Sequence, residues 1–276
     1  MARGLLFVAA SLSALLVAAI FGFLLCFTLP VFEADALASA LSWQWRPQQG
    51  EFGILPMVAG SLCLALSALL LALPLAIGLC SFIHGLGPAP LARPLLAVVR
   101  FMTSIPTVVY GLASIFLLVP LVRAGFEGSG FAWFSAAITL AVLVLPTLVL
   151  VLDQQFRLSQ ARIGLSAAAL GLSPAQQVLK LTLPLSRRGL AMAATLGFGR
   201  AIGDTLIPLM LAGNAAQVPH SLFDSIRTLT AHIALVVSTD AQSAAYNSLF
   251  LAGLVLFLIS FCVNLGLRRL RGGDHG

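Results

Sequence analysis

Arg200 and Asp204 are the residues of this sequence most able to do chemistry, because they lie in a stretch that is otherwise strongly apolar. A charge near the centre of a bilayer costs about 2.5–3.5 kcal/mol on insertion scales, so such groups are usually retained for function. Four residues apart on a helix, the two side chains share one face and can pair. Arginine offers five N–H donors in a planar fork that matches phosphate, and a carboxylate can hold the guanidinium between substrates. The pair predicts a polar point on the path of a charged substrate, the alternative being an ion pair that only locks helices together.

Other polar side chains interrupt apolar stretches and are further candidates for the substrate path. A proline within such a stretch kinks a helix and frees backbone groups that can line a cavity. A kink that serves only helix packing fits the sequence equally well. The candidates are Thr205 and Asn214, which follow the charged pair, and Ser104, Thr107 and Tyr110, which surround Pro106.

The composition is that of a membrane protein. Of the 276 residues, 60% are hydrophobic and 9% are charged, and the mean hydropathy is +1.05. A soluble domain has about 25% charged residues, so we expect this chain to be solvated by lipid. The pI near 9.9 arises from few charges. No run of Lys or Arg is dense enough to predict a nucleic-acid partner.

The sequence contains no motif for enzymatic chemistry. A Gly-x-x-x-x-Gly-Lys-Ser/Thr phosphate loop is missing, as are the Gly-x-Ser-x-Gly and His-Glu-x-x-His motifs. We therefore expect no catalytic residues, no cofactor and no ATP hydrolysis by this chain. His220 and His232 lack metal-ligand spacing and are expected to be solvated or interfacial. Four cysteines lie in apolar runs without paired spacing, which predicts small buried hydrophobes and no metal or redox site: Cys26, Cys63, Cys80 and Cys262.

Six apolar runs have the length of about 20 residues that a bilayer demands. We predict an all-α membrane protein with six transmembrane helices in a single domain, 1–276. The predicted spans are 5–30, 54–83, 101–122, 131–152, 189–212 and 246–267.

The distribution of Lys and Arg between the loops predicts that both termini lie in the cytoplasm. With that orientation the outer loops hold only Arg46, Arg123 and Arg227. Of the other 12 Lys and Arg residues, Arg200 lies within a span and 11 lie in inner segments. An excess of Lys and Arg is typical of the cytoplasmic loops of membrane proteins. The sequence around Ser39 resembles a signal-peptide cleavage site, but the apolar run before it is longer than an h-region, which favours an uncleaved first span.

The longest inner loop, 153–188, has the marks of a short helix pair. Residues 158–170 predict a helix that ends at Gly171, a C-cap glycine. Ser173 is a predicted N-cap, followed by Pro174 in the first helical position and Gln176 where a capping box needs Glu or Gln. We expect this second helix to stop before Pro184.

This loop resembles the EAA loop of ABC-importer permeases. Ala-Ala-Ala-Leu-Gly at 167–171 is followed, thirteen residues after the glycine, by Pro184 in a Leu-Pro pair. The chain departs from the family at Leu165 and Asp204, where an acidic residue and usually Glu are found, and at 82–85, where an acidic, polar helix end is common. Further blocks in family order resemble the PstC-type phosphate permeases: 52–56, 104–112, 199–205, 212–214 and 221–234.

The resemblance implies a type I ABC-importer permease fold in a bacterial inner membrane. The implied function is that of the permease subunit of an ATP-driven importer of inorganic phosphate, forming half of the translocation path. Implied partners are a second related permease, ATPase subunits and a substrate-binding protein. Another oxyanion (molybdate, tungstate, sulfate or a phosphonate) and a non-transporting sensor subunit remain alternatives. Residues implied to couple to the ATPase are Ala167, Ala169, Gly171, Ser173, Gln176, Leu183 and Pro184.

Overall fold

Five of the described helices are long and apolar enough to cross a bilayer, which confirms an all-α membrane protein. The computed structural model describes residues 2–29, 39–126, 128–237 and 244–272. The predicted first span extends to Pro30, which lies outside the described residues. The five helical segments are Arg3–Thr28, Leu55–Leu86, Thr107–Gly125, Trp133–Ala169 and Tyr246–Gly266.

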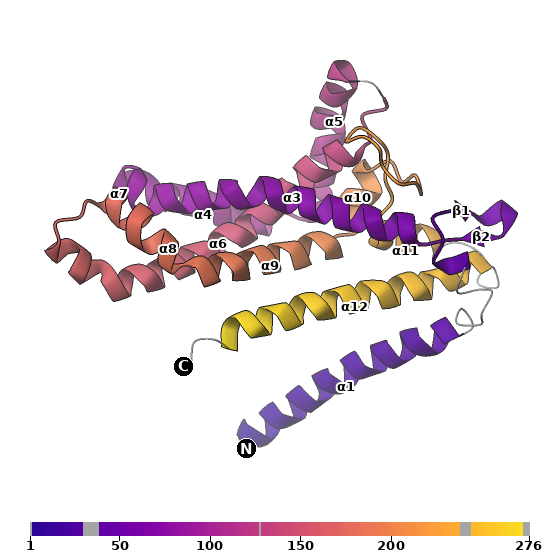
Figure 1. The fold of residues 1–276 in the computed structure, drawn as a ribbon, viewed down its shortest axis with the longest axis horizontal. Helices are drawn as coiled ribbons and strands as arrows, with labels where there is room; N and C mark the ends of the chain where they lie inside the picture. The colour runs from indigo at the N-terminus through magenta and orange to yellow at the C-terminus, as the bar shows by residue number, and fades with distance from the viewer. Residues whose placement is uncertain (1, 30–38, 127, 238–243, 273–276) are drawn as a thin grey trace.

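Most helices run roughly along one direction, while α5 projects from them at a steep angle (Figure 1). A two-stranded antiparallel hairpin, β1 with β2, lies at one end of the molecule and the short helices α7 and α8 lie at the other (Figure 1). The elements are α1 Ala2–Thr28, β1 Trp45–Arg46, η2 Pro47–Gln49, β2 Glu51–Phe52, α3 Leu55–Ser81, η3 Phe82–Leu86, α4 Ala89–Ser104, α5 Thr107–Gly125, α6 Trp133–Ala169, α7 Pro174–Gln177, η4 Val178–Thr182, α8 Leu183–Leu185, α9 Arg187–Gly203, α10 Leu206–Leu211, α11 Leu229–Val236 and α12 Ala244–Gly272.

Two of the predicted spans are broken in the structure. The predicted span 101–122 has its expected kink at Pro106, which is a full break, because Ile105 is extended and separates α4 from α5. The residue before a proline is disfavoured in the α conformation, which explains the position of the break. The predicted span 189–212 is likewise two helices, α9 and α10, separated by an extended Asp204.

The inner loop also differs from the prediction. Residues 158–170 do not form a separate short helix, because α6 continues without a break to Ala169. The next helical stretch does not stop before Pro184. It passes through α7 and the π-helical η4 into α8, where Pro184 lies in the first turn.

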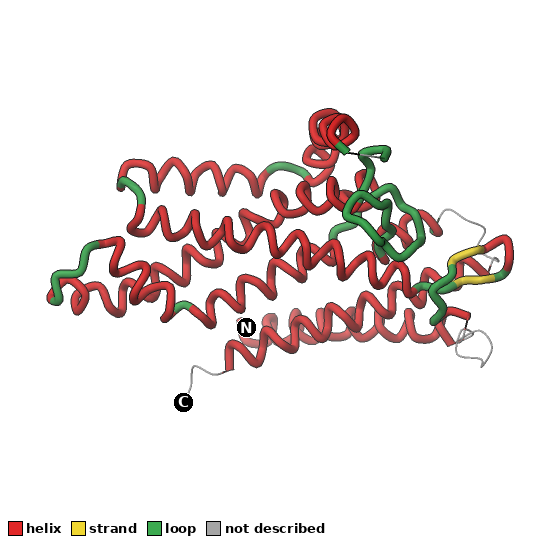
Figure 2. Tube along the Cα trace, turned by 45° about the horizontal axis from the view of Figure 1, so that its top comes forward, coloured by secondary structure: helices red, strands yellow, loops and turns green. Residues whose placement is uncertain are grey.

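The core is formed mainly by α3 packed on α6. Small residues recur along α3 at Ala65, Ala68, Ala72 and Ala76, all fully buried, which allows the two helices to approach closely. The helix α9 packs on both, and α12 packs on α9 and α11. The first helix contacts chiefly α12, as the tube view also shows (Figure 2).

The four cysteines are free thiols, but they are not all buried as predicted. Cys80 is buried and Cys63 is half-buried, whereas Cys26 and Cys262 are exposed on α1 and α12. These two helices lie at the edge of the bundle, so their outward faces carry apolar side chains that nothing in the single chain covers.

His232 is not solvated, contrary to the prediction. Its side chain is fully buried, its Nε2 lies 3.0 Å from the Ser248 hydroxyl, and the Trp45 ring packs edge-on against it at 4.5 Å. The β1–β2 hairpin therefore covers α11, which the sequence did not indicate. His220 is exposed, as predicted, and its N–H donates to the Asp224 carboxylate at 2.7 Å.

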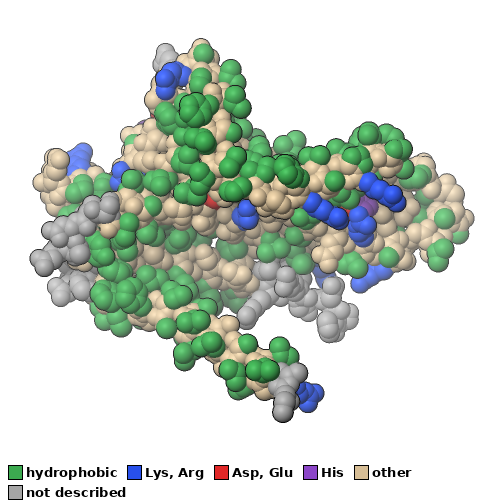
Figure 3. All heavy atoms as spheres, turned by 180° about the vertical axis from the view of Figure 1, so that it is seen from behind, with side chains coloured by type: hydrophobic (Ala, Val, Ile, Leu, Met, Phe, Trp, Pro, Cys, Tyr) green, Lys and Arg blue, Asp and Glu red, His purple; other side chains and the backbone are tan. Residues whose placement is uncertain are grey.

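Charge is distributed unevenly along the bundle. In the view from behind, apolar side chains cover much of the projecting α5, and several Lys and Arg side chains lie toward the end that carries α7 and α8 (Figure 3). The start of α1 and the end of α12 are also directed toward that end, away from the hairpin (Figure 1).

Candidate functional site

The break between α9 and α10 positions the two charged residues. Arg200 lies in the last turn of α9, which ends at Gly203. Asp204 then adopts an extended conformation, and its Oδ2 accepts the N–H of Ile207 at 2.9 Å. This contact caps the first turn of α10, where backbone donors have no helical partner. The Asp204 carbonyl in turn accepts the Thr230 hydroxyl at 2.8 Å, which ties the break to α11.

The predicted pairing of Arg200 with Asp204 is wrong for this conformation. Among the described residues no ion pair joins them; the pairs found lie elsewhere in the chain. The prediction assumed an unbroken helix, on which residues four apart share a face. Because α9 ends between them, the carboxylate turns to the start of α10. The guanidinium of Arg200 is exposed at the surface of the single chain.

Arg200 lines a polar pocket of about 320 Å³ between α9 and α12. Thr195 contributes from the same helix, five residues before Arg200, with its hydroxyl donating to the Ala191 carbonyl at 2.8 Å, and Ser260 and Asn264 contribute from α12. A guanidinium, hydroxyls and a carboxamide are the donors that an oxyanion needs when it leaves water. The remaining lining residues are Leu196, Gly199 and Val263. The arrangement can hold an anion.

Thr205 and Asn214 lie outside this pocket. Thr205 is half-buried at the helix break. Asn214 forms a tight turn with a positive φ of 59°, and its amide donates to the Leu209 carbonyl at 2.7 Å. Its own carbonyl accepts the Arg227 Nε at 2.8 Å. These contacts show that Asn214 stabilises the turn after α10. They do not place it on the substrate path.

Three of the predicted path residues lie at the break between α4 and α5: Ser104, Thr107 and Tyr110. The Tyr110 hydroxyl donates to the Met102 carbonyl at 2.9 Å across the break, so the kink predicted at Pro106 does free a backbone group. Tyr110 lines a different, largely apolar pocket of about 230 Å³ between α5 and α6. The predicted path residues thus lie in separate places, and only Arg200 lines the polar pocket.

The predicted coupling residues lie together at the end of the molecule formed by α7 and α8. Gly171 has a φ of +66°, the left-handed conformation predicted for a C-cap. The Ser173 hydroxyl accepts the Gln176 N–H at 3.3 Å, and the Gln176 side chain accepts the Ser173 N–H at 3.0 Å. This reciprocal capping box was predicted from the sequence.

The coupling residues differ in their exposure to solvent. Ala167 is buried, whereas Ala169, Gly171, Ser173, Gln176 and Pro184 are exposed and Leu183 is half-buried. Two leucines beside them are strongly exposed, Leu165 at 92% and Leu170 at 76%. Apolar side chains presented this openly are typical of an interaction surface.

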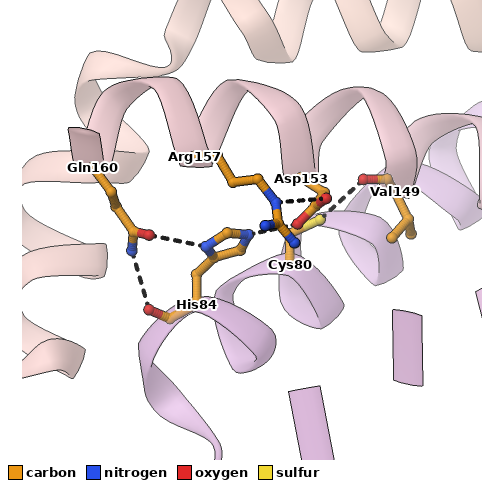
Figure 4. Close-up of polar contacts among 6 residues, drawn as sticks. All are labelled: Cys80, His84, Val149, Asp153, Arg157 and Gln160. Carbon is orange, nitrogen blue, oxygen red and sulfur yellow. Dashed lines mark hydrogen bonds and ion pairs between the residues drawn. The ribbon is translucent and has the colours of Figure 1, made fainter. Parts of the chain in front are cut away.

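Sequence reasoning missed two groups of polar residues. Ser260 and Asn264 are four residues apart in an apolar span, the same signal that drew attention to Arg200, but neutral side chains attract less notice. The second group joins α3 to α6: His84 contacts Asp153 and Gln160, and Asp153 also accepts from Arg157 (Figure 4). These residues are 69 or more positions from His84, so no local pattern connects them.

Comparison with known proteins defines the class. Residues 76–271 match the model of the binding-protein-dependent transport system inner membrane component. The chain belongs to this family, and it is therefore a multi-pass inner-membrane permease component of an ABC importer.

The particular type follows from individual relatives. The phosphate transport system permease protein PstC of Mycobacterium leprae is 33% identical over 80% of this chain and 76% of its own length. PstC of Pasteurella multocida is 29% identical over 82% of this chain and 76% of its own length. These relatives confirm the PstC-type resemblance. The MetNI methionine ABC transporter in an inward-facing conformation shares the fold, with a TM-score of 0.56 and 20% identity over 79% of this chain and 94% of its own.

Proposed function

We propose that this chain is the permease subunit of an ATP-driven importer of inorganic phosphate and forms half of the translocation path. The observation that carries the proposal is the polar pocket that Arg200 lines together with Thr195, Ser260 and Asn264. Relatives named as phosphate permeases cover most of the chain and support the choice of phosphate.

The pocket supplies what an oxyanion loses on leaving water. The Arg200 guanidinium offers a permanent positive charge and a planar fork of donors, and the Ser260 hydroxyl can donate to a further oxygen. Asp204 forms no ion pair with Arg200 here, because its carboxylate caps α10. The helix break lets the carboxylate leave or approach the guanidinium as the path opens to one side and then the other. Such an exchange favours release as well as binding.

The orientation is proposed from charge and arrangement. Eleven of the 15 Lys and Arg residues lie in the segments assigned to the cytoplasm, including the chain ends and 153–188. The coupling segment, 167–184, lies at the end toward which α1 begins and α12 finishes (Figure 1). We place this end in the cytoplasm, where an ATPase contacts the coupling segment, and the hairpin end on the side of the substrate-binding protein. A related permease provides the other half of the path, and ATP is hydrolysed in the ATPase.

The test is uptake by the complete complex in proteoliposomes. With the binding protein outside and ATP enclosed, we expect labelled phosphate to accumulate, and little accumulation without ATP or without the binding protein. Labelled sulfate, molybdate, tungstate and a phosphonate are measured in parallel. Preferential uptake of one of these would overturn the assignment of phosphate. A complex that assembles and hydrolyses ATP but accumulates none of them would favour a sensor subunit instead.

A further inference from the structure

A buried polar cluster joins the end of α3 to α6 (Figure 4). The His84 Nε2 lies 2.8 Å from Oδ1 of Asp153, and its Nδ1 lies 3.0 Å from Oε1 of Gln160. The side chains of His84 and Asp153 are each only 8% exposed. Gln160 also donates from Nε2 to the His84 carbonyl at 3.1 Å. The imidazole is therefore held by two residues of α6, and so is the backbone that carries it.

The contacts fix the orientation of the ring. Because the Gln160 amide donates to the His84 carbonyl, its oxygen is the atom that faces Nδ1. The Asp153 carboxylate faces Nε2, so both ring nitrogens of His84 lie against side-chain oxygens of α6. On the far side of the carboxylate, Arg157 donates from Nε to Oδ2 at 3.0 Å.

This cluster lies next to the coupling segment, 167–184. His84 belongs to the π-helical turn η3, and the next residue, Gly85, packs against the first turn of α7. A Cβ at Gly85 would lie 2.5 Å from the Pro174 carbonyl oxygen and 2.8 Å from the Val178 side chain. The coupling segment also continues from α6 through the turn at Gly171. It therefore rests on the two helices that the cluster holds together.

We propose that His84 is a positioning residue for coupling, which joins η3, at the end of α3, to residues 153–160 of α6 so that both helices follow the coupling segment as one unit. The proposal rests on the proposed function of 167–184 as the ATPase contact. Movement of α7 reaches α3 through Gly85, and it reaches α6 through the chain. Without the imidazole, α3 and α6 shift separately, and ATP hydrolysis then moves the substrate path less effectively.

The test compares phosphate taken up per ATP hydrolysed in the reconstituted complex. We expect His84→Ala to lower this ratio about tenfold, the size expected for loss of a hydrogen bond to a charged group. Assembly and ATP hydrolysis without binding protein should stay within about twofold of wild type, well below the tenfold change of one such bond. His84→Gln keeps one donor toward Asp153 and should give an intermediate ratio. Combining His84→Ala with Asp153→Asn should lower the ratio no further than His84→Ala alone.

The matched control is Trp133→Phe. Its indole Nε1 donates to Ser67 at 2.9 Å and also joins α6 to α3, but away from the coupling segment. A normal ratio in His84→Ala, or an equal loss in Trp133→Phe, would overturn the proposal. If His84→Ala does not assemble, a wild-type ratio in His84→Gln combined with Asp153→Asn overturns it in the same way. Gly171→Val separates the two claims, because unchanged stimulated hydrolysis in that variant refutes the ATPase contact itself.

Discussion

Gly60 in α3 permits a close approach of the chain at Arg227 to the core, and a methyl group there should be disruptive. A Cβ at Gly60 would lie inside contact distance of the Arg227 carbonyl oxygen and 3.2 Å from its carbonyl carbon. The segment must move by about 1 Å to restore ordinary contact. The neighbouring bond from the Leu229 N–H to the Ser61 hydroxyl, 2.8 Å long, would then stretch.

The magnitude follows from these two effects. Overpacking a filled site costs about 1–3 kcal/mol, and loss of the Ser61 bond adds about 1 kcal/mol. We therefore expect Gly60→Ala to lower the free energy of unfolding by about 2–4 kcal/mol. Because α11 also holds the Asp204 carbonyl, phosphate uptake should fall although Arg200 is unchanged.

The assay is unfolding of the purified subunit in detergent by titration with dodecyl sulfate, together with uptake by the complex. Gly78→Ala is the matched control in the same helix, because a Cβ there meets nothing within 4 Å. It should be neutral or slightly stabilising, since glycine is a weak helix former. Equal stability of the two variants would refute the close packing of this segment on α3.

Three further predictions test other parts of the structure. Gly171→Val meets no neighbour but places a β-branched residue at a φ of +66°, so the bundle should fold while ATP hydrolysis stimulated by the binding protein falls; unchanged hydrolysis in a normally assembled complex would contradict the docking role. In a cysteine-free background, a cysteine at Gln48 or Ser129 should react with an impermeant reagent from outside, and labelling only from the cytoplasmic side would overturn the orientation. Burial lowers the pKa of His232 to about 3 from an ordinary 6.5, so protonation favours the unfolded state and stability should be lost as pH falls from about 6.5 toward 3. His232→Gln should flatten this acid dependence of unfolding, and an unaltered profile would show that His232 is not the group responsible.

Local signals in the sequence were enough to predict the helices and several of their ends. Apolar length predicted most of the spans, because a bilayer imposes one dimension on every crossing helix. The capping box at Ser173 and the left-handed Gly171 were predicted because caps depend only on nearby residues. Motif order across the chain was sufficient to predict the family.

The predictions that were wrong share a physical cause, because each concerned a feature that depends on contacts between distant parts of the chain. The pairing of Arg200 with Asp204 was inferred from helix periodicity, but a bond to Ile207 turns the carboxylate to the next helix. The burial of His232 depends on a hairpin about 180 residues earlier, and the His84 cluster on a helix 69 residues later. No periodicity within one segment carries such information.

The role of Arg200 is tested most directly by phosphate uptake in proteoliposomes that contain the variant complex. Arg200→Gln should insert and assemble yet lower uptake about 10- to 100-fold, the range expected for loss of charged hydrogen bonds to the anion. Arg200→Lys should restore only part, because an ammonium keeps the charge but lacks the fork. Arg123→Gln, which removes an arginine that donates to the Ser129 carbonyl outside the pocket, should transport normally. Uptake at the wild-type rate by Arg200→Gln would contradict the account and move the search for the path to the break at Pro106.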